Sequence, residues 1–196
     1  MDVFDTLDER VARVVREFEE ASRDVSREVF RAPKLHPESA RFLHMLVLIG
    51  AYRRLLEIGG GIGYSTLWLA DAARRNGGTL VSCEIEPSHV EVNKQHIRRA
   101  GLHGVVTYLV GDARKTVAEH PGPFDFVLID TTKTDYITYF ELLTPKLLPN
   151  ALIVADNAIS HARALEGYLE HIRRHPLYAS LIVPVGRGLA LSRRIR

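Results

Sequence analysis

Short apolar runs alternate with longer segments of helical spacing through most of the chain, and glycine or proline stands near most of the junctions. The apolar runs predict strands at 53–58, 79–84, 105–110, 124–130 and 150–155. The segments between them predict helices at 64–75, 88–101, 112–119 and 134–148. Because strands that alternate with helices form βαβ units, we expect a mainly parallel sheet with helices on both faces.

The N-terminal segment precedes this alternation and predicts two helices. Thr6 with Glu9 has the spacing of a capping box, and helical spacing then continues to an end near Pro33 through Val11, Val14, Val15, Phe18, Val25 and Val29. This apolar stripe covers either the domain core or a partner subunit. A second helix is predicted between Pro37 and Gly50.

The C-terminal segment predicts one more helix and a hairpin. The helix lies around 162–174, and two apolar runs follow at 178–183 and 189–193. A short turn, Gly186-Arg187-Gly188, joins these two runs, so an antiparallel hairpin is expected at the end of the sheet.

Composition limits the class of protein. With 196 residues and 46% hydrophobic content, the chain fits one domain, with a helical extension over 1–50 and the core over 51–196. Lys and Arg number 26 against 24 acidic residues, which leaves no basic footprint for nucleic acid. The single cysteine, Cys83, fits a reducing compartment, and no apolar stretch reaches the ~20 residues of a membrane span. We therefore expect a cytoplasmic protein without membrane association.

A glycine-rich turn, here called the glycine turn (residues 59–63), stands within Leu55-Leu56-Glu57-Ile58-Gly59-Gly60-Gly61-Ile62-Gly63-Tyr64-Ser65-Thr66. Its order predicts a strand, a tight turn and a helix. Glycines allow positive φ and let the backbone approach a ligand above the helix N-terminus. A plain turn without a ligand is the alternative, but it would not need so many adjacent glycines, each of which costs conformational entropy.

Polar, mostly acidic residues end every predicted strand of the alternating region. They are Glu57, Glu84, Asp112, Asp130 and Asp156. One such residue, for example Asp112, is often only a helix cap. Five of them at the carboxyl ends of parallel strands share one edge of the sheet, where ligands of such folds bind.

The spacing of these acids bears on the cofactor. Glu84 follows the glycines by about twenty residues, the usual distance of an acid that binds ribose hydroxyls. A dinucleotide site would need G-x-G-x-x-G, but position 64 is Tyr. Glu57 would repel a pyrophosphate and attract an amino group. S-adenosylmethionine (SAM) fits these features, and a dinucleotide-dependent oxidoreductase is the alternative.

Asp130 and the pair Asp156-Asn157 each follow a strong apolar run. Two carboxylates and an amide oxygen at adjacent strand ends suit a hard divalent cation such as Mg²⁺, Mn²⁺ or Ca²⁺. The alternative for Asp156-Asn157 is a cap of the following helix. For Lys133, close to Asp130, the alternative is a solvated loop residue.

Together these segments resemble the cation-dependent small-molecule O-methyltransferases, which include catechol and caffeoyl-coenzyme A O-methyltransferases. The resemblance runs from about Leu35 to Ser192, through LHPESARFL, LLEIGGGIGYST, CEIEP, GDA, FDFVLIDTTKTDYITYFELLTPKLLPNALIVADN and GRGLALS. It implies an α/β, Rossmann-like class I methyltransferase fold: a seven-stranded, mostly parallel sheet with a terminal antiparallel hairpin and extra N-terminal helices. It also implies a homodimer, with the first helix as a candidate interface.

The resemblance implies roles for individual residues. Those implied for the cofactor are Leu35, Glu57, Gly59, Gly61, Gly63 and Ser65 for the methionine part, Glu84 for the ribose, Asp112 and Ala113 beside adenine, and Asp130. The implied metal ligands are Asp130, Asp156 and Asn157. Lys133 is the implied general base, and Asp130 is also counted as catalytic.

The implied reaction is transfer of a methyl group from SAM to a hydroxyl of a small catechol-like or hydroxycinnamoyl-like acceptor. A non-catalytic SAM-binding protein is a further alternative. Three positions depart from the family pattern: Thr132 and Arg187 stand where Asp is common, and Gly60 where Thr or another side chain is usual. Arg187 either favours an anionic acceptor or is a solvated turn residue.

Overall fold

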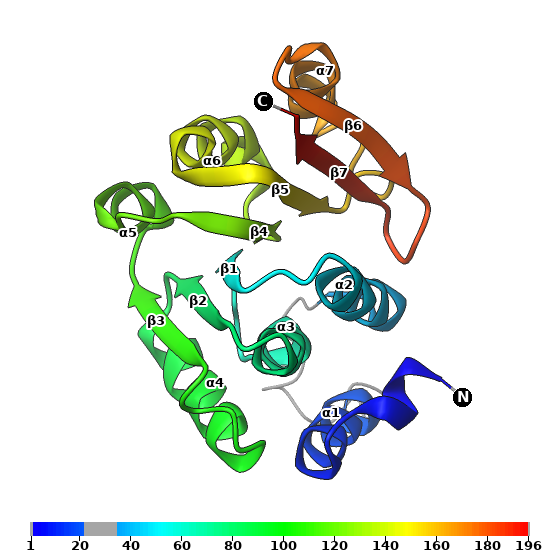
Figure 1. Cartoon of the computed structure of the whole chain (residues 1–196), viewed down its shortest axis with the longest axis vertical. Coiled ribbons are helices and arrows are strands. Elements are labelled where there is room, and N and C mark those ends of the chain that lie inside the picture. The colour runs from blue at the N-terminus through cyan, green and yellow to red at the C-terminus, as the bar shows by residue number, and fades with distance from the viewer. Residues whose placement is uncertain (1, 22–34, 196) are drawn as a thin grey trace.

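The computed structural model of the chain describes residues 2–21 and 35–195 and places one sheet between two layers of helices (Figure 1). The strands are β1 (Arg54–Ile58), β2 (Thr79–Glu84), β3 (Val106–Val110), β4 (Phe124–Ile129), β5 (Leu147–Asp156), β6 (Tyr178–Val183) and β7 (Leu189–Arg194). The α-helices are α1 (Glu9–Ala21), α2 (Pro37–Ile49), α3 (Tyr64–Arg75), α4 (Pro87–Arg99), α5 (Ala113–Glu119), α6 (Tyr136–Leu143) and α7 (Glu166–Arg174). Short 3₁₀ turns are η1 (Val3–Thr6), η3 (Lys133–Asp135) and η4 (Thr144–Lys146).

The seven strands form one sheet in the order β3-β2-β1-β4-β5-β7-β6. The pairs from β3 to β5 are parallel, and β7 is antiparallel to both of its neighbours. This confirms the predicted mostly parallel sheet with a terminal hairpin. The strand order reverses between β1 and β4, so the carboxyl ends of these two strands flank the crevice where ligands of such folds bind.

Alternate residues of the strands enter two separate hydrophobic cores. On one face, Leu55, Phe126 and Leu128 pack with α1 to α4, and on the other Leu56 and Val127 pack with α5 to α7. Burial on both faces explains why these strands are continuous apolar runs without polar alternation.

Helix α1 packs its apolar stripe into the chain's own core. Val11, Val14 and Phe18 are at most 1% exposed, and the Phe18 ring lies 5.7 Å from that of Tyr64 and 4.5 Å from that of His96. The described part of the stripe therefore belongs to the domain core, while the homodimer with the first helix as a candidate interface stays a prediction. Val25, Val29 and the end near Pro33 lie outside the described residues.

Several predicted boundaries differ from the structure; the strand predicted from 150, for example, begins at Leu147. The Thr6 hydroxyl donates to the Val3 carbonyl, and α1 is capped by Asp8, whose carboxylate accepts from the Arg10 amide at 3.0 Å. The helix predicted over 134–148 ends at Leu143, because Pro145 interrupts helical hydrogen bonding and β5 begins at Leu147. The helix predicted from 162 begins at Glu166.

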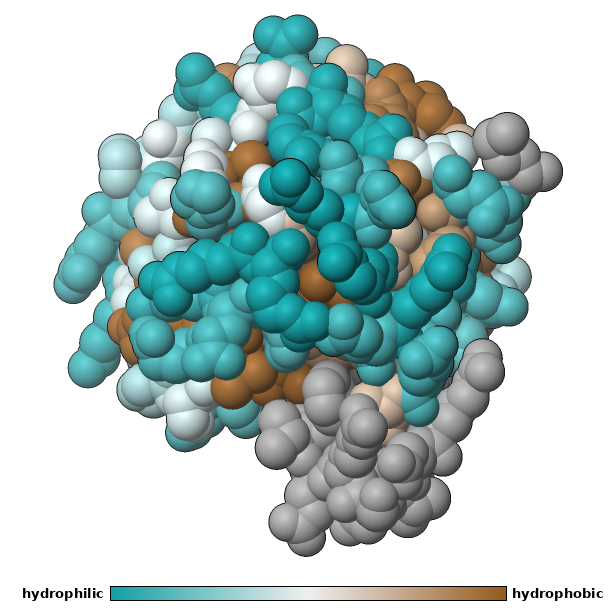
Figure 2. Space-filling model, turned by 90° about the horizontal axis from the view of Figure 1, so that it is seen from below, coloured by the Kyte–Doolittle hydropathy of each residue, from teal (hydrophilic) through white to brown (hydrophobic). Residues whose placement is uncertain are grey.

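Hydrophilic residues predominate on the face shown in Figure 2, with small hydrophobic patches between them. In the described part of the chain, no helix has the length and apolar character needed to cross a membrane.

A buried histidine–aspartate pair joins α2 to α3. The His44 Nε2 atom lies 2.9 Å from Asp71 Oδ2, and both side chains are fully buried. Arg74 and Arg75 also contact the Asp71 carboxylate, at 2.8 and 2.7 Å. Burial opposes the charge, but the His44 hydrogen bond and the arginine charges prevail and lower the pKa of Asp71. The pair therefore depends on an ionised Asp71.

Replacing Asp71 with Asn should lower the free energy of unfolding by about 3 kcal/mol, because the buried His44 loses its charged partner. Urea unfolding at pH 7 measures this value. Since the pKa of Asp71 is lowered in the fold, the difference from the wild type should shrink as the pH falls below 3.8. Glu170→Gln, which removes an exposed ion pair with Arg174, is the control and should cost less than about 0.5 kcal/mol.

Candidate functional site

The glycine turn connects β1 to α3 at the crevice. Gly59, Gly61 and Gly63 have φ values of 96°, 49° and 105°. A side chain at Gly59 would overlap the carbonyl oxygen of Asp130, and one at Gly63 would press on Asn93. Positive φ and close contact therefore both require glycine here.

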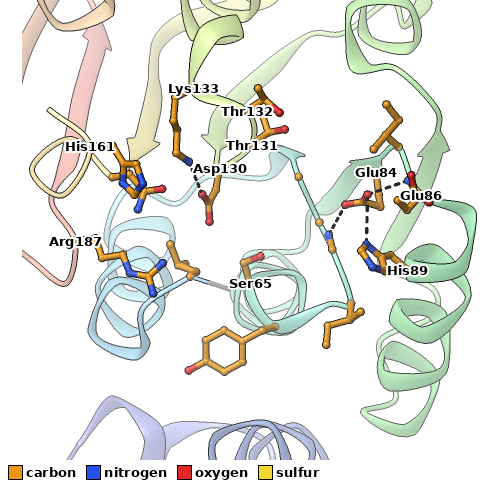
Figure 3. Close-up of a pocket in the computed structure, with 18 residues that line it drawn as sticks. Ser65, Glu84, Glu86, His89, Asp130, Thr131, Thr132, Lys133, His161 and Arg187 are labelled. Atoms are coloured by element: carbon orange, nitrogen blue, oxygen red, sulfur yellow. Dashed lines mark hydrogen bonds and ion pairs between the residues drawn. The ribbon is translucent and has the colours of Figure 1, made fainter. Parts of the chain in front are cut away.

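Glu84, at the end of β2, is fixed beside the glycine turn. One carboxylate oxygen accepts from the Gly61 amide at 2.7 Å, and the other accepts from the Glu86 amide at 3.0 Å (Figure 3). The His89 ring lies 3.7 Å from the same carboxylate. A carboxylate has about four acceptor positions, so each oxygen can accept a further hydrogen bond, such as one from a ribose hydroxyl.

Glu57 lies within β1 and is fully buried. Its Oε2 atom accepts from the hydroxyls of Thr66 at 2.7 Å and Ser82 at 2.8 Å. Burial raises the pKa of its carboxyl group, and these hydroxyls oppose that effect. Gly60 lies beside the Glu57 carboxylate, and a side chain at Gly60 would overlap the Ser82 hydroxyl.

Asp130 and Lys133 lie beyond the end of β4, on the other side of the crevice. The Lys133 Nζ atom is 3.3 Å from Asp130 Oδ1 and donates to the Tyr136 hydroxyl at 2.9 Å. The Tyr136 hydroxyl in turn donates to the Asp156 carbonyl at 3.4 Å. Burial raises the pKa of Tyr136, which keeps this hydroxyl protonated. The lysine is thus held in a defined position.

Asp156, the last residue of β5, is 1% exposed, and neither carboxylate oxygen has a hydrogen-bond partner within the described residues. Burial, followed by the charge of Asp130, raises the pKa of Asp156 to about 7. An unpaired buried carboxylate costs stability, so native proteins usually pair it or place it on a metal. Asp156 therefore fits a cation.

Asn157 follows directly and adds an amide to this edge. Its φ of 69° is uncommon outside glycine and asparagine. Its Nδ2 atom donates to the Ser160 hydroxyl at 3.2 Å, so the side-chain carbonyl oxygen is the atom available to a cation. Asp130, Asp156 and Asn157 together offer the oxygen donors that Mg²⁺, Mn²⁺ and Ca²⁺ prefer.

One cavity of about 780 Å³ connects both sides of the crevice (Figure 3). This volume is within the range of small-molecule sites. Of the residues predicted from the sequence, the cavity wall contains Leu35, Gly59, Gly61, Ser65, Glu84, Asp130, Lys133 and Asn157.

Other predicted residues do not form the wall. Glu57 and Asp156 are buried, and Gly63 is the N-cap residue of α3. Asp112 caps α5 by accepting from the Arg114 amide at 2.9 Å, and the Arg114 guanidinium lowers the pKa of Asp112. Ala113 is buried in the first turn of α5. Contacts of Glu57, Gly63, Asp112 and Ala113 with a bound cofactor, and of Asp156 with a metal ion, stay predictions.

The cavity also contains residues that sequence reasoning missed. Ile85 is 61% exposed beside Glu84, and His89 and His161 line the wall. Tyr136 is not part of the wall, but its hydroxyl accepts a hydrogen bond from Lys133. Only Tyr136 left a usable signal, since it stands three residues after Lys133, a spacing that brings side chains together at a helix start. Arg187, noted as a departure, lines the cavity.

Comparison with known proteins gives consistent matches. Residues 10–195 match the family described as O-methyltransferase. A catechol O-methyltransferase of Niastella koreensis is 37% identical over 139 residues, which are 69% of this chain and 62% of that protein. One of Mycobacterium tuberculosis is 35% identical and covers 79% of this chain and 78% of its own length. The chain thus spans less than two thirds of the Niastella protein.

Solved structures match over nearly the whole chain. An O-methyltransferase from Bacillus cereus, in complex with SAH, is 26% identical with a TM-score of 0.80, covering 95% of this chain and 91% of that one. The O-methyltransferase TomG from Streptomyces achromogenes, in complex with SAM, is 26% identical with a TM-score of 0.79, covering 96% and 91%.

Asp156 should make stability depend on pH in the absence of metal. Its folded-state pKa is about 7, above the ordinary 3.8, so the wild type loses stability as the pH rises from 5 to 8. Asp156→Asn lacks this titrating group, so its free energy of unfolding, relative to that of the wild type, should rise by about 2 kcal/mol between pH 5 and 8. Urea unfolding in EDTA measures it. Glu119→Gln, an exposed change, should follow the wild type, and a pH-independent difference for Asp156→Asn would contradict the expectation.

Proposed function

The chain belongs to the O-methyltransferase family, and on this premise we propose that it transfers a methyl group from SAM to a hydroxyl of a small catechol-like or hydroxycinnamoyl-like acceptor, with a divalent cation. The observation that carries the proposal is the buried, unpartnered Asp156 carboxylate beside Asp130 and Asn157. Family membership argues against the dinucleotide-dependent oxidoreductase.

The methyl donor would occupy the part of the cavity between the glycine turn and Glu84. Glu84 is already oriented by two backbone amides and would accept hydrogen bonds from the ribose hydroxyls. Ile85 offers an exposed apolar surface next to it, which suits the adenine ring. Leu35 and Ser65 also line the wall, and Figure 3 shows Ser65 between Glu84 and Arg187; the methionine part would lie beside these two residues.

The cation would be held by Asp130, Asp156 and Asn157. When bound, such an ion lowers the pKa of a coordinated hydroxyl and orients two vicinal oxygens. Thr132, where the family commonly has Asp, is exposed and lines the cavity. Its hydroxyl carries no charge, so the negative charge for a cation comes from Asp130 and Asp156.

Lys133 would receive the proton of the acceptor hydroxyl at its Nζ atom. This atom is held at the cavity wall between the Asp130 carboxylate and the Tyr136 hydroxyl. A fixed position matters, because methyl transfer needs the acceptor oxygen in line with the donor methyl group. Tyr136 acts as a positioning residue, since its hydroxyl touches Lys133 and the cavity wall does not include it.

Arg187 bears on the choice of acceptor. Its side chain is exposed, lines the cavity and faces the same space as His161 and Asp130 (Figure 3). Its positive charge also opposes, in part, the rise in the pKa of Asp156, so this charge acts on the candidate cation site. A guanidinium in this position favours an acceptor that carries a carboxylate or another anionic group.

Methyl transfer should require a divalent cation. The purified protein is assayed with labelled SAM and paired vicinal-diol acceptors, one neutral and one carrying a carboxylate. We expect turnover with Mg²⁺ or Mn²⁺, at least a hundredfold loss in EDTA, and recovery when metal is restored. The carboxylate member of each pair should be preferred, and Arg187→Ala should remove that preference.

Binding of SAM is measured in the same samples by calorimetry. Binding without turnover on any acceptor would favour the non-catalytic SAM-binding alternative. Turnover that EDTA leaves unchanged would refute the role of the cation, while the methyltransferase activity itself would stand.

Lys133→Ala should lower kcat by about 10² to 10⁴ because it removes the proton acceptor, and should leave the Kd for SAM within about twofold. Tyr136→Phe should cause a smaller loss, since the base remains but loses the hydroxyl that positions it. Steady-state kinetics and calorimetry measure these effects. Lys115→Ala, on the exposed surface of α5, is the matched control, and wild-type turnover in Lys133→Ala would refute the assigned base.

A further inference from the structure

A second group of ligating side chains lies on the helix layer formed by α6 and α7. Glu141 comes from α6, His171 from α7, and His175 directly follows α7. Each offers one ligand atom, and the three atoms lie within 4.8 Å of one another. In residues 2–21 and 35–195, no other three His, Cys, Asp or Glu side chains come as close together. We call these residues the α6–α7 cluster.

Aromatic contacts fix the two imidazole rings. His171 and His175 are four residues apart and therefore project from the same side of α7. The Phe140 ring lies edge-on to both, at 5.5 Å from each centroid, and the Tyr178 ring lies 5.0 Å from that of His175. The rings thus approach each other as part of the packed structure.

The contact between His171 and Glu141 brings two of the three ligand atoms together. The His171 Nε2 atom is buried and lies 2.7 Å from Glu141 Oε1, but it makes no hydrogen bond with any described residue. The two atoms are thus already adjacent. A tetrahedral zinc ion with bonds of about 2.0–2.1 Å would hold them about 3.3 Å apart, so binding would need only a small movement of the two side chains.

Metal binding by His175 requires one hydrogen bond to change. Its Nδ1 atom accepts from the Leu177 amide at 3.3 Å, which is longer than usual for this type of bond. A metal on Nδ1 would replace this contact, and a metal on Nε2 would move the ring proton to Nδ1. In either case a long hydrogen bond is exchanged for a metal–nitrogen bond.

We propose that Glu141, His171 and His175 bind a transition metal ion such as Zn²⁺, with water completing the coordination. Two imidazoles and one carboxylate are a known zinc ligand set, whereas Mg²⁺ and Ca²⁺ prefer oxygen donors alone. The α6–α7 cluster would therefore select a different ion from the oxygen-rich site at Asp130 and Asp156. Because α6 and α7 pack side by side (Figure 1), the ion would fasten the two helices together.

Zinc titration tests the proposal. The full chain is stripped with chelator and dialysed into excess Mg²⁺ to saturate the proposed oxygen-rich site, and Zn²⁺ is added in a calorimeter. We expect one zinc per chain in the wild type and at least tenfold weaker binding in His171→Ala and in His175→Ala. His103→Ala, an exposed histidine outside the cluster, should bind zinc as the wild type does.

Two further measurements keep the test decisive. Glu141→Gln changes an exposed side chain and should preserve the fold while weakening zinc binding. Zinc should raise the Tm of the wild type, and this rise should be absent in the His171→Ala, His175→Ala double variant. Zinc affinity that is unchanged in the histidine variants, or lost in Asp156→Asn instead, would overturn the proposal. Neither result depends on methyl transfer.

Discussion

The contact between the glycine turn and the end of β4 sets the geometry of the whole candidate site. Gly59 packs so closely on the Asp130 carbonyl that no side chain fits, and the Asp130 amide donates to the Ile58 carbonyl at 3.0 Å. Since the strand order reverses between β1 and β4, this contact joins the side of the cavity that carries Glu84 to the side that carries Lys133. A methyl donor on one side and a methyl acceptor on the other would thus be held by two backbone segments whose relative position is fixed.

Three buried carboxylates show how the chain treats charge in its interior. Asp71 has a histidine and two arginines, and Glu57 has two hydroxyls. Asp156 has no hydrogen-bond partner among the described residues, and its pKa is raised to about 7. Asp71 is compensated by the protein itself and serves the fold, whereas Glu57 keeps one oxygen, Oε1, without a hydrogen-bond partner among the described residues. The third is compensated only if something binds, and it is therefore the residue that most directly indicates a ligand.

The sequence predicted most of the fold, because residues buried on both faces of a parallel sheet produce unmistakable apolar runs. It failed where local signals competed. Apolar residues continue at Leu147 after Leu143, which suggested one helix over 134–148, but Pro145 and the start of β5 end the helix at Leu143. Of the five acids predicted from strand ends, Glu84 and Asp130 line the cavity. Ile85 and His161 were missed, since loop residues have no periodicity that would place them at a cavity.

The departure at Gly60 is explained by a residue from another strand. The Ser82 hydroxyl from β2 occupies the space that a side chain at Gly60 would need, and it donates to Glu57 at 2.8 Å. A side chain at position 60 and the hydroxyl of Ser82 would therefore compete for the same space, and only one of them can be present. Within the glycine turn alone, Gly60 lacks the side chain that is usual at this position. The Glu57 carboxylate nevertheless has a hydroxyl partner, because parallel pairing brings Ser82 of β2 beside β1.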